Sequence, residues 1–285
     1  MSKANPNIWK CCDKIFNLTE KPLIIGILNV TPDSFSDDGI FYKIEDALSQ
    51  GERMISEGAD IIDIGGESSR PFSEPVSIEE EKRRVLPVIE KIADMTDVPL
   101  SIDTYKPEVA EEALKLGAKI VNDISGCSNP DMIELIKKFG AGVVIMHMKG
   151  SPKSMQVNPI YDDVVAEIKD FFSQRKQELE TKRVNTEQIV FDPGFGFGKR
   201  PEDNLKLLKE LNKFLELERP LMIGTSRKSF IAKTIGYSDS EKERIEGTVA
   251  TNVMGLMNGA RIFRVHNVGF HKKALQMAWS VIHSK

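Results

Sequence analysis

Eight short apolar runs, separated by long amphipathic segments, restrict the possible folds of this chain more than any other feature of its sequence. The runs are rich in β-branched residues and continuously apolar, which is typical of parallel strands covered on both faces. They span residues 22–30, 60–66, 99–104, 119–125, 142–148, 189–194, 221–226 and 261–267. Eight such units in one chain predict an α/β fold, a (β/α)8 TIM barrel.

The length of the chain suits this barrel as one domain with a short N-terminal extension. Its 285 residues, 40% of them hydrophobic, provide a large core. We expect residues 22–285 to form the barrel. Residues 1–21 form the extension, in which Ile15, Phe16 and Leu18 make a plug or hairpin below the barrel. An open, doubly wound sheet is the alternative, but no glycine-rich dinucleotide fingerprint follows the first run.

Charge and cysteine content exclude several classes of function. The chain carries 39 basic and 43 acidic residues, a net charge of −4, without a long basic run, so we expect no nucleic-acid partner. No apolar run is long enough to cross a bilayer. Three cysteines, two of them adjacent, do not fit a disulfide framework, and residues 1–10 lack the apolar stretch of a signal peptide. We therefore expect a cytoplasmic protein that does not bind membranes.

Polar residues follow nearly every apolar run. In (β/α)8 barrels the active site lies at the carboxyl ends of the strands. The polar residues at these ends are Asn29, Asp63, Asp103, Asn122, Asp123, His147, Asp192, Ser226, Arg227, Lys228, Arg264 and His266. The sequence therefore predicts a polar binding site here, in which Asp63 and Asp123 support other residues and His147 is packed in the core.

Three of these residues suit a flat, nitrogen-containing ring. The carboxylates of Asp103 and Asp192 can accept paired hydrogen bonds from a ring edge, and Asn122 supplies both a donor and an acceptor. Each has a structural alternative. A carboxylate at a strand end can cap the next helix or pair with a lysine, and Asn122 can tie down its own loop.

A second group suits phosphate and a hard metal ion. Arg70, Arg264 and His266 match phosphate oxygens, and the amide oxygen of Asn29 suits a Mg²⁺ ion that keeps several waters. The alternative is that Arg264 and His266 pair with carboxylates on neighbouring strands. Glu67 is expected either to orient Arg70 or to face water.

The glycine-rich segment 192–199 is not a nucleotide-binding loop. Pro193 stands where a Walker A loop requires glycine, and Arg200 stands where it requires serine or threonine. Three glycines interleaved with Phe195 and Phe197 instead predict a flexible loop that presses aromatic faces onto a flat ligand.

Together these motifs resemble one known family over nearly the whole chain. They are the segments 27–37, 65–71, 101–104, 121–124, 192–199, 226–228 and 264–266. The chain resembles the dihydropteroate synthases of folate biosynthesis. The resemblance implies a (β/α)8 barrel that condenses 6-hydroxymethyl-7,8-dihydropterin pyrophosphate with p-aminobenzoate, releasing 7,8-dihydropteroate and pyrophosphate with the help of Mg²⁺.

The resemblance also implies roles for the residues that match the family's motifs. The pterin is held by Asp103, Asn122, Asp192 and Lys228. The pyrophosphate is held by Asn29, Arg264 and His266, with Asn29 also beside Mg²⁺. The p-aminobenzoate pocket is formed by Ser69, Arg70, Pro71, Phe197 and Ser226, and catalysis depends on Asp33, Phe35, Arg70 and Lys228. Ser69 and Phe72 depart from the usual threonine and glycine, which puts sulfonamide affinity in question.

Two other readings share part of this pattern. A methyltransferase that passes a methyl group from a folate to a corrinoid would share Asp103, Asn122 and Asp192, but it would not need Arg70 and Arg264 to converge on an anion. A non-catalytic pterin-binding paralogue would be expected to lose Arg264 and His266, which are both present.

The last two helical segments indicate a homodimer. Residues 248–257 and 270–283 carry much apolar surface, including Met254, Leu256, Met257 and Trp279. The alternative is that these residues only cover the barrel. His271 and His283, on the last segment, are expected to be surface residues.

Overall fold

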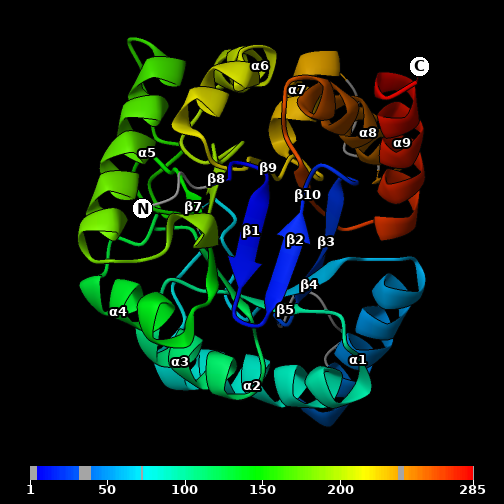
Figure 1. Ribbon diagram of the computed structural model, residues 1–285. Coiled ribbons are helices and arrows are strands. Elements are labelled where there is room, and N and C mark those ends of the chain that lie inside the picture. The colour runs from blue at the N-terminus through cyan, green and yellow to red at the C-terminus, as the bar shows by residue number, and fades with distance from the viewer. Residues whose placement is uncertain (1–4, 32–39, 72, 237–240, 285) are drawn as a thin grey trace.

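The computed structural model describes residues 5–31, 40–71, 73–236 and 241–284, and in these ranges eight parallel strands form a nearly closed barrel (Figure 1). In chain order they are β3 (Leu23–Asn29), β4 (Ile61–Gly65), β5 (Leu100–Asp103), β6 (Ile120–Asp123), β7 (Gly142–Met146), β8 (Ile189–Asp192), β9 (Met222–Ile223) and β10 (Ile262–Val265). Neighbours follow the order β8-β7-β6-β5-β4-β3-β10-β9, and an isolated bridge between Phe191 and Leu221 joins the two ends. The predicted (β/α)8 barrel is confirmed.

Helices surround the barrel in the ring seen in Figure 1. They are α1 (Ile40–Ser56), α2 (Ile78–Met95), α3 (Pro107–Lys115), α4 (Pro130–Phe139), α5 (Val164–Thr181), α6 (Pro201–Lys209), α7 (Ser229–Ile235), α8 (Glu241–Met257) and α9 (Val268–Ile282). Their starts follow local chemistry: the Ser77 side chain accepts a hydrogen bond from Glu80 N, and Asn129 caps α4 before Pro130. None of the helices in the described part of the chain has both the length and the apolar character to span a bilayer.

The amino-terminal end of the barrel is closed by a hairpin that precedes it. Its strands, β1 (Ile8–Cys11) and β2 (Lys14–Asn17), pair antiparallel and lie across the centre of the ring in Figure 1. Trp9 and Leu18 are fully buried against the first residues of the barrel strands, whereas Ile15 is 64% exposed. The Trp9 indole Nε1 donates to Gln188 O at 2.9 Å, which satisfies its buried polar atom.

Helices α8 and α9 pack against each other, and this contact buries His271. The Asn252 side chain on α8 lies 3.3 Å from His271 Nδ1, and burial lowers the pKa of this histidine to about 4. The prediction that His271 is a surface residue was therefore wrong, because it faces α8 rather than solvent. His283, at the end of α9, is exposed as predicted.

Candidate active site

The register of the strands brings the predicted polar residues to one rim. Asn29 lies beside Gly65, Gly65 beside Asp103, and Asp103 beside Asn122, so three predicted residues share one layer. Because parallel strands end at the same edge, their side chains surround the carboxyl end of the barrel.

Arg264 is the centre of a buried ionic cluster on this rim. Its Nε donates to Asp63 Oδ2 and its Nη2 donates to Asp103 Oδ2, each at 2.6 Å. The Asn122 amide donates to the same Asp63 oxygen at 3.0 Å. Arg264 therefore does pair with carboxylates, but they lie on β4 and β5, whereas the strands next to β10 are β3 and β9. The alternative considered above, pairing with carboxylates on neighbouring strands, is thus not what the structure has.

This cluster also shows which contacts Asp103 and Asn122 make. Within the described residues, the Asp103 side chain neither caps the next helix nor forms an ion pair with a lysine. Asn122 does not tie down its loop either, because Asp123 does so by accepting from Ser125 N at 2.7 Å and from Cys127 N at 3.2 Å. Asp63 and Asp123 are thus supporting residues, as predicted.

The electrostatics of the rim set carboxylates against cations at close range. Burial raises the pKa of Asp103 to about 7, against the opposing effect of the Arg264 guanidinium, and burial also raises the pKa of Asp192. Burial and the nearby Arg264 charge lower the pKa of Lys228 to about 8, while Asp192 and Asp103 oppose this. The rim therefore holds ionisable groups whose pKa values a bound polar ligand can change.

The segment 192–199 is held by side chains from neighbouring loops. Gln156 Nε2 donates to Gly196 O at 2.6 Å, and the Tyr161 hydroxyl donates to Gly198 O at 2.8 Å. Gly196 N in turn donates to Asn204 Oδ1 at 2.7 Å. At Gly194, with φ 69°, a Cβ would lie 2.0 Å from the carbonyl oxygen of His147. The expected flexible loop is instead a tightly bonded turn that requires glycine for its shape.

Only one of the two phenylalanines in this segment reaches the rim. Phe195 is 1% exposed and packs against Phe230, with ring centroids 6.2 Å apart. The Phe197 ring lies beneath the Lys228 ammonium, 3.9 Å from Nζ to the ring centre. The prediction that both rings face a ligand was therefore wrong for Phe195.

Lys199, which the sequence analysis did not single out, holds the same segment from inside. Its ammonium, 3% exposed, lies within 3.2 Å of Gly194 O, Phe197 O, His147 O and His147 Nδ1. Burial lowers the pKa of Lys199 to about 7 and that of His147 to about 2. His147 is therefore a neutral, packed histidine, as predicted, and its ring accepts a hydrogen bond.

His266 and Ser226 form a second pair on the rim. The Ser226 Oγ accepts from His266 N at 3.2 Å and lies 3.0 Å from His266 Nδ1. The contact holds the two side chains together at the rim. Burial and the nearby Arg227, Arg264, Lys228 and Arg70 charges lower the pKa of His266 to about 3. The His266 ring is thus neutral, with one nitrogen that donates and one that accepts.

The predicted residues of the loop after β4 lie at the same rim. Ser69 is half-buried and lines a small recess together with Asp103 and Tyr105. Arg70 and Pro71 are exposed, and the Arg70 charge is close enough to affect His266. Asp33, Phe35 and Phe72 lie outside the described residues.

Comparison with known proteins agrees with this geometry. A model of the pterin binding enzyme family matches residues 25–266. The dihydropteroate synthase of Escherichia coli (strain K12) is 44% identical over 264 residues, 93% of each chain. The Xanthomonas albilineans dihydropteroate synthase with 4-aminobenzoic acid has a TM-score of 0.91 and 40% identity, covering 99% of this chain and 100% of that chain. The same enzyme in complex with 7,8-dihydropteroate has a TM-score of 0.87 and 38% identity, covering 98% of this chain and 99% of that chain.

The chain belongs to the dihydropteroate synthase family of pterin-binding enzymes. The predicted family, the barrel and the assignment to the transferases are thereby confirmed. In this fold the residues that the resemblance assigns to the pterin and the pyrophosphate, namely Asn29, Asp103, Asn122, Asp192, Lys228, Arg264 and His266, all lie at or just after the carboxyl ends of barrel strands.

The described residues at this rim offer few ligands for a metal ion. No group of three or more His, Cys, Asp or Glu side chains that could hold a metal ion occurs within the residues described. Asn29, at the end of β3, offers one amide oxygen. It fits an ion that takes its other ligands from phosphate oxygens and water, which is how Mg²⁺ usually binds.

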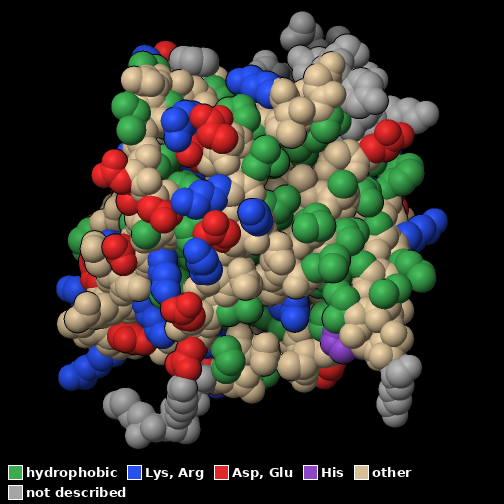
Figure 2. Space-filling view, turned by 90° about the horizontal axis from the view of Figure 1, so that it is seen from above, with side chains coloured by type: hydrophobic (Ala, Val, Ile, Leu, Met, Phe, Trp, Pro, Cys, Tyr) green, Lys and Arg blue, Asp and Glu red, His purple; other side chains and the backbone are tan. Residues whose placement is uncertain are grey.

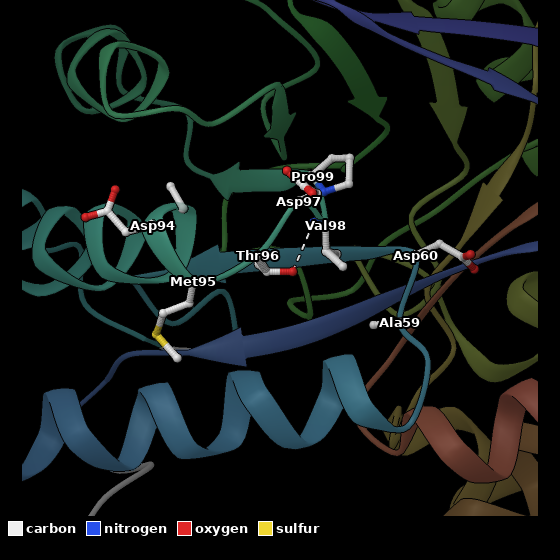
Figure 3. Close-up of a pocket in the computed structure, with 9 residues that line it drawn as sticks. Ala59, Asp60, Asp94, Met95, Thr96, Asp97, Val98 and Pro99 are labelled. Carbon is white, nitrogen blue, oxygen red and sulfur yellow. Dashed lines mark hydrogen bonds between the residues drawn. The ribbon is translucent and has the colours of Figure 1, made fainter.

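A cavity of about 710 Å³ lies far from these residues, at the opposite end of the barrel (Figure 3). It is lined by the residues before β4 and β5 and by the end of α2, including Asp60, Asp94 and Asp97. Asp60 already binds Lys21 and the backbone N–H of Ile24. The cavity contains none of the dihydropteroate synthase motifs, so its size does not make it the active site.

Proposed function

We propose that the chain condenses 6-hydroxymethyl-7,8-dihydropterin pyrophosphate with p-aminobenzoate. The C–O bond to pyrophosphate breaks, a C–N bond forms, and the amine releases one proton. The observation that supports this most directly is the buried cluster in which Asp103, Asn122 and Arg264 meet on one rim. It combines recognition of a ring edge with a cation for a departing anion.

The pterin would be held by Asp103, Asn122, Asp192 and Lys228. Asp192 is 4% exposed, and its Oδ1 already accepts from Gly194 N at 2.8 Å, which orients the carboxylate. Lys228 lies over the Phe197 ring, so the two side chains offer a cation and an aromatic face side by side. Buried carboxylates near the ring would also stabilise a cationic pterin methylene.

The pyrophosphate would be held by Asn29, Arg264 and His266. Arg264 uses two of its five N–H groups on Asp63 and Asp103, and the remainder can donate to phosphate. We propose that the His266 ring carries its proton on Nε2 and donates it to a phosphate oxygen, while Nδ1 accepts from the Ser226 hydroxyl. Mg²⁺ beside Asn29 would neutralise the developing charge on the leaving group.

The p-aminobenzoate pocket would be formed by Ser69, Arg70, Pro71, Phe197 and Ser226, together with Lys228. Arg70 is exposed at the rim, where a guanidinium can pair with the benzoate carboxylate. The weak aniline nucleophile needs positioning more than deprotonation, so we assign no strong general base. We propose that catalysis depends on Asp33, Phe35, Arg70 and Lys228.

The test is a direct assay with dihydropterin pyrophosphate, p-aminobenzoate and Mg²⁺, in which dihydropteroate and pyrophosphate are both measured. We expect equimolar products, competition by a sulfonamide, and loss of activity in Arg264→Ala. Tight pterin binding without product would overturn the synthase proposal and favour the methyltransferase or the binding protein.

We also propose that the chain forms a homodimer through α8 and α9. Figure 2, which views the molecule of Figure 1 from above, shows hydrophobic side chains gathered on its right-hand side, where α8 and α9 lie. The large exposed apolar residues of the two helices are Met254, Met257, Phe270, Met277, Val281 and Ile282, each 44% to 65% exposed. Leu256, expected in this surface, is buried instead.

A symmetric pairing of two copies would cover this face. Sedimentation equilibrium should show a dimer that dissociates in Met257→Glu/Met277→Glu, with Ile15→Glu on the hairpin as control. A monomeric wild-type protein would rule out the dimer.

We propose a cytoplasmic location on the basis of the cysteines. Cys11, Cys12 and Cys127 are all free thiols, and burial raises the pKa of each. Such thiols fit a reducing compartment. Fractionation of cells that express the full chain tests this location.

A further inference from the structure

Lys106 connects three groups that belong to one loop. It lies three residues after Asp103 and is 9% exposed. Its ammonium donates to Glu67 Oε2 at 2.6 Å, to Glu81 Oε2 at 2.5 Å and to Val76 O at 2.6 Å. An ammonium has three protons, so its donor capacity is fully used.

The three acceptors lie at both ends of the loop that joins β4 to α2. Glu67 follows the end of β4, Val76 lies just before α2, and Glu81 lies in the first turn of α2. Glu67 Oε2 also accepts from Val76 N at 2.9 Å, and its Oε1 accepts from the Tyr105 hydroxyl at 3.0 Å. The expectation that Glu67 orients Arg70 or faces water was therefore wrong, since Glu67 closes the base of the loop.

Among the described residues, the side-chain contacts that join the tip of the loop to other elements are more exposed than those at its base, although Ser73 Oγ also donates within the loop to Ser68 O and Arg70 O. The Glu67, Lys106 and Glu81 side chains are only 11%, 11% and 1% exposed. By contrast, the tip residue Glu74 pairs with Lys153 in the loop after β7, and both side chains are about 70% exposed. Exposed pairs of this kind contribute little. The position of the tip is therefore set mainly from the base.

We infer that Lys106 is a positioning residue for p-aminobenzoate. It fixes the loop whose tip carries Ser69 and Arg70, and it does so from the same strand end that presents Asp103 to the pterin. The two half-sites are thus joined through four consecutive residues, 103–106. This inference rests on the proposed function, because it assigns the loop to the second substrate.

The experiment separates this role from general stability. Wild-type kinetics first establish the synthase reaction. In Lys106→Gln the KM for p-aminobenzoate should then rise at least about tenfold, because misplacing a binding group by a fraction of an ångström is costly. The KM for dihydropterin pyrophosphate should change less than about twofold, since Asp103 and Arg264 keep their bond. Lys106→Arg should recover part of the loss.

Lys115→Gln is the matched control, because Lys115 lies on α3 in an exposed pair with Glu112. Thermal unfolding of each variant identifies the folded fraction. If Lys106→Gln does not fold, Tyr105→Phe tests the same base by removing one bond to Glu67, and a smaller, equally selective rise in KM is expected. Equal changes for both substrates, or no change in a folded variant, would overturn the inference even though the synthase activity stands.

Discussion

The two ends of the barrel are built from the same eight strands but contain opposite chemistry. At the amino-terminal end, the hairpin residues Trp9, Cys11 and Leu18 pack on a layer of fully buried apolar side chains from the barrel strands. At the carboxyl end, Asp63, Asp103 and Arg264 form ion pairs. On β10, for example, Ile262 belongs to the first layer and Arg264 to the second.

The difference shows how one fold separates stability from chemistry. Burying apolar area at the closed end stabilises the fold, whereas burying charges at the open end costs desolvation that the ion pairs only partly offset. Substitutions at the first end should therefore change stability and spare activity. Substitutions at the carboxyl end should change activity and spare stability.

The largest effect is expected from Trp9→Ala at the closed end. Removing the buried indole should lower the free energy of unfolding by about 3–5 kcal/mol. The activity of the folded fraction should not change, since Trp9 lies far from the rim. Urea unfolding and kcat/KM at low temperature measure the two quantities. Trp9→Phe keeps a ring but loses the bond to Gln188 O, so its free energy of unfolding should lie between those of the wild type and Trp9→Ala. A folded Trp9→Ala protein without activity would contradict the separation of the two ends.

Asp192→Asn at the open end should show the opposite behaviour. We expect kcat/KM to fall by about 100-fold or more, about 2.7 kcal/mol, because the carboxylate that receives the ring edge becomes an amide. Folding raises the pKa of Asp192, so the native state disfavours its charge, and the neutral amide should leave stability unchanged or raise it. Steady-state kinetics and urea unfolding provide the check. A clear loss of stability with intact activity would reverse the assignment.

Gly142→Ala probes the packing of the hairpin with a single methyl group. A Cβ at this position would lie 2.4 Å from Cys11 Sγ and 3.1 Å from Trp9 Nε1. Overpacking of this kind should cost about 1–3 kcal/mol. Gly269→Ala is the control, because its added Cβ meets Glu57 at 3.5 Å, an ordinary contact. Combining Gly142→Ala with Cys11→Ala should recover part of the loss in urea unfolding, and no recovery would place the strain elsewhere.

The smallest effect concerns pH at the open end. Burial lowers the pKa of Lys228 from its ordinary value to about 8, so the ammonium loses its proton above that pH. If the charged form holds the pterin, kcat/KM should fall up to about tenfold per pH unit above this point. The Lys228→Arg variant should have a lower kcat/KM than the wild type, but this value should stay constant to higher pH, because a guanidinium stays charged. A wild-type profile that is flat to pH 10 would exclude this role.

The fold was readable from the sequence because each strand is a local signal. All eight predicted runs contain a strand, although the seventh is reduced to Met222 and Ile223. The polar ends were also readable, because the register of a barrel aligns them without knowledge of side-chain contacts.

What the sequence did not reveal is which side chains pair across the fold. Arg264 meets Asp63 from a position 201 residues away, and Lys106 bridges Glu67 and Glu81. Lys199 looked like the end of a glycine-rich loop and proved to be its internal anchor. His271 was expected on the surface of the last helix and proved to be buried. For Arg264, Lys106 and His271 the partner lies on another element, and Lys199 also contacts His147 from outside its own segment, so no local pattern predicts these contacts.

The hairpin has a consequence for the order in which the chain becomes structured. Its residues leave the ribosome before the barrel strands, yet Trp9 bonds to Gln188, and Arg219 donates to Asn5 O and Ile8 O. Until residues 188 and 219 have been synthesised, the hairpin lacks these partners. Contacts of such high sequence separation form slowly and leave apolar surface exposed in the meantime. The hairpin therefore waits for most of the barrel to be synthesised before it can pack.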